Sequence, residues 1–139
     1  MRRAGRLVSL ALLLAFVAGC TYYPTVVDTG SPRLEPKNGR LVRTDTGAVC
    51  YFELESTGKY GDTLLAAESQ FARRVRIEAP GGAPIRTLDI PGDSRLDFSP
   101  DGLRITLSEL IEPLPPGEGI IVTLIFAKSG RIGVVSKVE

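Results

Sequence analysis

The side chains that most often perform chemistry in proteins are scarce in this sequence. The chain has no histidine, one methionine and two cysteines, Cys20 and Cys50. Without histidine, acid–base catalysis would depend on Asp, Glu, Lys and Tyr alone. The carboxylates are scattered along the chain, and no serine stands in a nucleophile-elbow context. The sequence therefore predicts that the protein is not an enzyme.

A turn followed by an alternating strand is the most suggestive motif. It reads "SPDGLRITLSEL" (Ser99–Leu110), and the alternation puts Arg104 and Thr106 on one face of the strand. The same turn is found in propeller blades, but a propeller needs about four or more blades of ~40 residues. The motif occurs once in this chain, so a propeller is excluded. A strand of this shape can carry metal ligands, although a guanidinium stays protonated and cannot ligate.

Cys50 has two interpretations. In "GAVCYFELES" it alternates onto the face shared by Phe52 and Leu54. We favour a small buried hydrophobe, the usual state of a free cysteine. The alternative is a reactive thiol or a metal ligand.

The N-terminus has the features of a secretory signal. Basic residues precede an apolar stretch, Leu7–Ala18, which is too short to span a bilayer comfortably. The sequence "VAGC" then ends at Cys20 and resembles a bacterial lipoprotein cleavage box. The resemblance implies cleavage before Cys20 and acylation of its thiol with fatty-acid chains such as palmitate. The alternative is an ordinary secretory peptide with a chance cysteine.

Processing of this kind changes the charge of the chain. Removing Met1 and the three signal arginines leaves 14 Lys/Arg against 16 Asp/Glu, a net charge of −2. No basic field remains to attract nucleic acid, and no small-molecule substrate is evident. If Cys20 carries lipid, Cys50 has no partner for an internal disulfide. We expect an extracytoplasmic protein, anchored by lipid to the membrane of the cell envelope.

The pattern along the chain predicts three parts: a signal peptide over 1–19, the lipidated cysteine with a proline-containing tether over 20–38, and one folded domain over 39–139. Strands are expected where β-formers alternate, and they recur every ~8–12 residues. The predicted strands cover 47–56, 63–69, 73–80, 85–91, 95–100, 103–110, 119–129 and 130–138. Such spacing is typical of an all-β sandwich or barrel.

Two segments carry a family resemblance. "AVCYFELESTGKYGDTLLAAES" and "IPGDSRLDFSPDGLRITLSELIEPLPPGEGIIVTLIFAKSG" resemble, in order and spacing, the periplasmic copper chaperone family PCu(A)C. The resemblance covers Leu41 to Val138. It implies a cupredoxin-like (immunoglobulin-like) β-sandwich.

The same resemblance implies a copper site whose ligands are replaced. The family binds Cu(I) through His and Met, and its His-x-Met pair falls on Arg104 and Thr106 here. An earlier family histidine falls near Glu78, and the intervening segment "GGAPIRTLDI" contains no methionine. Cu(I) prefers sulfur and imidazole donors, so we expect no metal cofactor. One hypothesis is that Arg104 and Glu78 form an ion pair in place of the metal.

We therefore expect a non-enzymatic, lipid-anchored accessory for binding or assembly, whose partners would be the membrane and a membrane protein or oxidase-assembly component. One alternative is a functional Cu(I) chaperone for respiratory oxidase assembly, with copper held by atypical or partner-supplied ligands such as Cys50. A further alternative is a purely structural envelope lipoprotein.

Overall fold

The computed structural model describes residues 32–139, which form ten β-strands. The predicted signal peptide, Cys20 and most of the predicted tether lie outside the described residues. In the described range there is no helix with the length and apolarity needed to cross a membrane. The strands are β1 (Leu34–Arg43), β2 (Gly47–Ser56), β3 (Asp62–Glu68), β4 (Ala72–Glu78), β5 (Pro84–Ile85), β6 (Leu88–Ile90), β7 (Ser94–Phe98), β8 (Arg104–Leu110), β9 (Gly119–Phe126) and β10 (Gly130–Val138).

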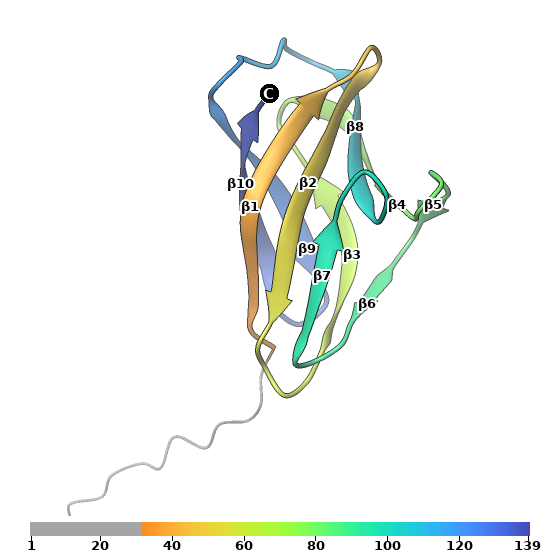
Figure 1. Ribbon diagram of the computed structural model, residues 1–139, viewed down its shortest axis with the longest axis vertical. Coiled ribbons are helices and arrows are strands. Elements are labelled where there is room, and N and C mark those ends of the chain that lie inside the picture. The colour runs from red at the N-terminus through yellow and green to blue at the C-terminus, as the bar shows by residue number, and fades with distance from the viewer. Residues whose placement is uncertain (1–31) are drawn as a thin grey trace, which may run out of the picture.

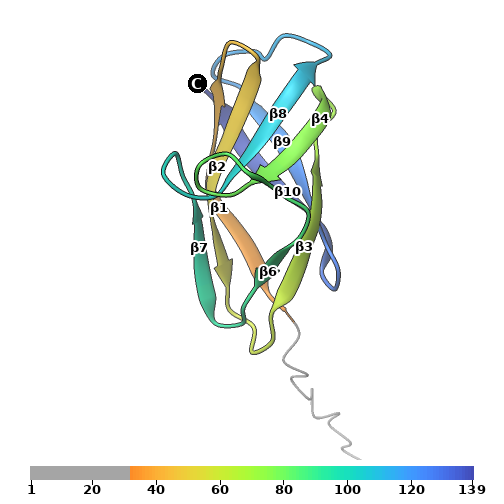
Figure 2. The same cartoon turned by 90° about the vertical axis from the view of Figure 1, so that its right-hand side faces the viewer.

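The strands form one continuous sheet that folds over itself into a sandwich. Its order is β5-β4-β8-β2-β1-β10-β9-β3-β6, and β7 pairs separately with β2. Figures 1 and 2 show β2, β7 and β8 in one layer, with β9 and β10 behind them in the other. All these strand pairs are antiparallel except β1 with β10, which is parallel.

Alternation of side chains builds the core between the layers. In β2 every second residue from Ala48 to Ser56 is buried, and β9 alternates in the same way from Ile120 to Phe126. From β8, Ile105 and Leu107 enter the same core. The predicted all-β sandwich is confirmed. The alternate residues of each strand face outward, toward solvent or a binding site.

The turn at Ser99–Gly102 positions the residues that sequence analysis singled out. The amide of Gly102 donates to the carbonyl of Ser99 at 3.1 Å, and the amide of Ser99 donates to the carbonyl of Leu103 at 2.9 Å. This turn moves the chain from β7 to β8, and the two strands pair with successive halves of the same edge of β2. Arg104 therefore begins β8.

The first strand corrects the predicted domain boundary. Leu34 to Lys37, assigned to the tether, belong to β1 and pair with the last residues of β2. The register shifts between Lys37 and Arg40, and Asn38 takes a left-handed conformation with φ of 55°. Because this bulge resets the alternation, the two halves of β1 do not read as one strand in the sequence.

A second difference concerns the predicted strand over 85–91. The segment is split into β5, which pairs with β4, and β6, which pairs with β3. It crosses from one layer to the other, so a single strand cannot be maintained. The segment over 63–69, whose composition also suits a short helix, is the strand β3.

Candidate functional site

Arg104, Thr106 and Glu78 lie together on the outer face of the layer formed by β4, β8 and β2. Glu78 is directly opposite Arg104 in the pairing of β4 with β8. Thr106 lies two residues further along the same face, between Arg76 of β4 and Val49 of β2. The antiparallel register therefore brings together the three residues onto which the resemblance places copper ligands.

Arg104 and Glu78 form an ion pair. Nε of Arg104 lies 3.2 Å from Oε2 of Glu78, and the two side chains are 29% and 16% exposed. The same buried Nε has no hydrogen-bond partner within the described residues, so the contact with Glu78 does not have hydrogen-bond geometry. The attraction is thus mainly Coulombic, and partial burial screens it less than an exposed pair would be screened.

The turn between β4 and β5 lies over the guanidinium. Gly82 has φ of +91°, and a Cβ at this position would be 3.0 Å from Nη2 of Arg104. A side chain on Gly82 would therefore crowd the arginine as well as strain the backbone. The hydroxyl of Thr106 is buried and has no hydrogen-bond partner among the described residues.

The donor chemistry of this cluster does not fit Cu(I). The cluster offers a guanidinium, a hydroxyl and a carboxylate, and the first of these is a permanent cation. Cuprous ion prefers thiolate, thioether or imidazole. Across residues 32–139, no three His, Cys, Asp or Glu side chains are grouped in a way that could hold a metal ion.

Cys50 is separated from this cluster by the thickness of the sheet. Its neighbour in β8 is Ile105, whose side chain enters the core, and Cys50 itself is 0% exposed. Burial raises the pKa of the thiol to about 11, although a contact of 3.3 Å with Oγ of Ser136 acts in the opposite direction. A thiol with this pKa is protonated at neutral pH, so it is a poor nucleophile and a poor metal ligand.

A buried carboxylate that sequence analysis missed lies on the other layer. Asp62 accepts hydrogen bonds from the amides of Thr63, Lys128 and Ser129 at 2.7, 2.9 and 2.7 Å. Burial alone would raise the pKa of Asp62, but the hydrogen bonds from Ser129, Lys128 and Thr63 hold it below its usual value. The group ties the start of β3 to the β9–β10 turn. Its only signal in the sequence is an acid directly before a predicted strand.

The sequence was compared with models of known protein families. The family model of the LpqE-like lipoproteins matches residues 29–138. No curated protein sequence gives a significant match.

Solved structures of PCuAC domains share the fold. The copper-bound PCuAC domain from PmoF2 is 23% identical, with a TM-score of 0.69 over 76% of this chain and 92% of that domain. The apo form of that domain is 25% identical, with a TM-score of 0.66 over 76% and 89%. The solution structure of CuI-DR1885 from Deinococcus radiodurans is 20% identical, with a TM-score of 0.62 over 88% and 83%. The predicted cupredoxin-like sandwich and the resemblance to PCuAC domains are confirmed.

Proposed function

The chain belongs to the LpqE-like lipoprotein family, and from this premise we propose that it is a lipid-anchored envelope protein that has kept the PCuAC fold without its copper chemistry. It acts as a non-enzymatic accessory for binding or assembly, through contacts with proteins at the membrane surface. The parts of the chain are a signal peptide over 1–19, a tether from Cys20, and the sandwich that follows.

The anchor is supported by the sequence around Cys20 and by the family description. Incorporation of labelled palmitate tests it, with Cys50→Ala as the matched control because Cys50 is buried in the domain. We expect Cys20→Ala to abolish labelling and to release the protein from the membrane fraction, and Cys50→Ala to keep both. Equal labelling of the two variants would contradict lipidation at Cys20.

The observation that carries the rest is the ion pair of 3.2 Å between Arg104 and Glu78. It lies where the resemblance places copper ligands, and it presents an arginine cation to an incoming metal cation. A like charge next to a bound metal ion opposes its binding. The preserved sandwich with an exchanged cluster supports a role in contacts with proteins.

Equilibrium dialysis against Cu(I) with a competing chelator tests this proposal. We expect the chelator to retain the copper and the protein to take up none. Tight uptake that Cys50→Ser abolishes would instead favour the alternative of a functional copper chaperone for oxidase assembly. The burial and raised pKa of Cys50 argue against that alternative, since a thiolate shared by two molecules would require the core to open.

Copper held partly by ligands of a partner needs a separate measurement. Dialysis repeated with solubilised envelope membranes would reveal copper uptake that depends on both components. Site-directed crosslinking in intact cells then separates an accessory from a purely structural lipoprotein, since an accessory gives discrete crosslinked products from particular surface positions.

A further inference from the structure

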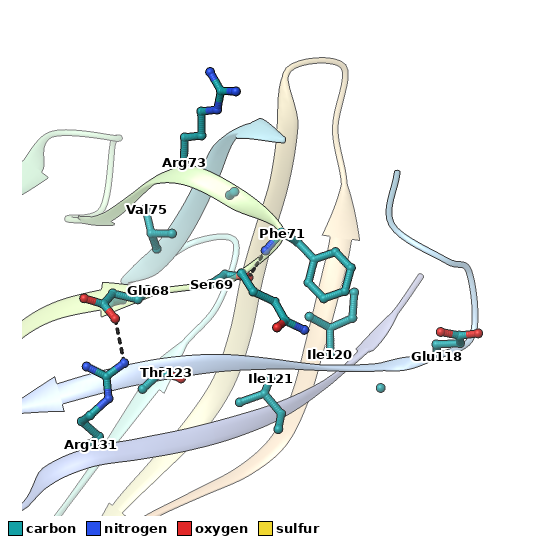
Figure 3. Close-up of a pocket in the computed structure, with 14 residues that line it drawn as sticks. Glu68, Ser69, Phe71, Arg73, Val75, Glu118, Ile120, Ile121, Thr123 and Arg131 are labelled. Carbon is teal, nitrogen blue, oxygen red and sulfur yellow. Dashed lines mark hydrogen bonds and ion pairs between the residues drawn. The ribbon is translucent and has the colours of Figure 1, made fainter. Parts of the chain in front are cut away.

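An open groove separates the two layers at the edge of the sandwich formed by β4. It has a volume of about 770 Å³ and is lined by Phe71, Val75 and neighbouring residues on one side and by Ile120, Ile121 and Thr123 of β9 on the other. In Figure 3, Val75 and Phe71 point from the β4 side toward β9, Ile120 lies next to Phe71, and Ile121 projects from the opposite side of β9. Ile121 is 56% exposed, and Glu68, Glu118 and Arg131 also line the groove, so exposed apolar and charged side chains lie together there.

The edge of β4 above this groove is unpaired. β8 pairs with β4 along its length, but on the opposite side β5 pairs only with Ile77 and Glu78. Within residues 32–139 no strand pairs with the outer side of Ala72–Arg76. The amide of Ala72 donates to the carbonyl of Ser69 at 3.4 Å, and the other amides and carbonyls on that side are available to a further strand, which is how extended peptides add to a sheet.

The exposed side chains of this edge are basic. Arg73, Arg74 and Arg76 are exposed on β4, and Arg86 is exposed just after β5. Arg74 has one distant carboxylate partner, Glu109 at 3.7 Å, whereas Arg76 forms no ion pair with any described residue. This edge is positive, in contrast to the predicted net charge of the mature chain, −2.

The geometry of paired strands predicts which residue types a bound peptide should have at each position. Residues of an added strand would stand opposite those of β4, with Cβ atoms about 4.5–5.5 Å apart. Positions opposite Arg74 and Arg76 favour carboxylates, and the alternate positions, opposite Val75 and over the groove, favour apolar side chains. A second copy of the chain would set arginines against arginines.

We propose that the free edge of β4 binds an extended segment of a partner protein in which acidic and apolar residues alternate. This inference rests on the proposed function as a protein-binding accessory, and it gives that function a surface. Basic residues on an edge strand can also serve to prevent aggregation. Binding of a defined peptide distinguishes the two roles.

The experiment uses a peptide of about seven residues, which spans the open edge, with Glu and Val in alternation. It is titrated into the purified isotope-labelled protein without copper, and amide chemical shifts are followed. We expect saturable shifts at Arg73–Arg76 and Thr123. A peptide of the same composition with its acids grouped together should bind at least about tenfold more weakly, because only half of its side chains would meet their sites.

Charge reversal identifies the contact. Arg76→Glu should weaken binding of the Glu/Val peptide about tenfold and should favour a Lys/Val peptide instead. Arg33→Glu is the matched control, because Arg33 is also exposed but precedes β1, and it should leave binding unchanged. The same loss in both variants would overturn the proposal.

Methylation of peptide amides tests the backbone pairing. In one strand, alternate amides point to opposite edges, so N-methyl groups on one set should abolish binding and on the other set should not. Equal tolerance of both sets, absence of binding, or equal binding to vesicles of anionic lipid would each overturn the proposal. These measurements contain no copper, so their failure would leave the dialysis result and the proposed function standing.

Discussion

At the scale of single residues, the ion pair between Arg104 and Glu78 has a measurable energetic signature. Removing one partner leaves a partly buried charge without its counterion, whereas removing both leaves none. We expect Arg104→Met and Glu78→Gln each to lower the free energy of unfolding, and the double variant to lower it by about 1 kcal/mol less than the sum. Urea unfolding of the four proteins measures this coupling. Strictly additive losses would mean that the two charges do not interact.

Asp62 makes a prediction about acid stability. Its pKa in the folded protein is lowered, so its contribution is fully present above the pKa of the unfolded chain, about 3.9, and is lost as the pH falls through the lower folded value. Asp62→Asn keeps one acceptor oxygen but turns an N–H group toward backbone amides. This substitution should lower the free energy of unfolding by about 2 kcal/mol at pH 7.

Thermal unfolding of both proteins between neutral pH and pH 2 provides the measurement. The difference between wild type and Asp62→Asn should shrink as the pH falls below about 4. A difference that stays constant over this range would show that the charge of Asp62 contributes nothing. Asp89→Asn is the matched control, since Asp89 is exposed and makes a single side-chain contact of 3.2 Å with Thr63.

At the scale of strands, the register of β4 with β8 predicts that a copper site can be introduced by substitution. Positions 78 and 104 are direct partners and 106 is on the same face, so Glu78→His, Arg104→His and Thr106→Met together would provide two imidazoles and a thioether. We expect this triple variant to take up Cu(I) in the dialysis experiment, and we expect no uptake by the wild type.

The control for that variant uses the opposite face of the sheet. Ile77 and Ile105 are also direct partners, but both are buried in the core, so Ile77→His with Ile105→His should destabilise the fold and yield no site. If the triple variant folds and still takes up no copper, the correspondence of Arg104, Thr106 and Glu78 to the family ligands is wrong.

How much the sequence predicts also depends on the strand concerned. The alternation in β2 and β8 is regular, and it predicted both the strands and the shared face of Arg104 and Thr106. Burial of Cys50 followed from the same rule. β1 was not predicted as a strand, and its first residues were assigned to the tether, because Asn38 and the adjacent bulge interrupt its period. The groove beside β4 could not be predicted, since it depends on how the layers separate and on the absence of a long partner strand there.

At the scale of the whole molecule, β1 joins the two layers, since it pairs with β2 on one side and with β10 on the other. Its first half is bound to β2 only, through pairs such as Leu34 with Ser56 and the 2.9 Å contact of Lys37 with Glu55. A fold held by a strand of this kind should depend on residues that sequence analysis assigned to the tether.

A chain that begins at Gly39 should therefore be less stable than one that begins at Pro32, by at least about 3 kcal/mol. The loss combines the burial of Leu34 with several ladder hydrogen bonds, because the end of β2 would be left with one paired edge instead of two. Urea unfolding of the two chains measures the difference, and the chain from Pro32 is the control for removal of residues 1–31. Equal midpoints would place the start of the folded domain at Gly39. A large loss would mean that a pull on the proposed lipid anchor acts directly on the strand that joins the layers.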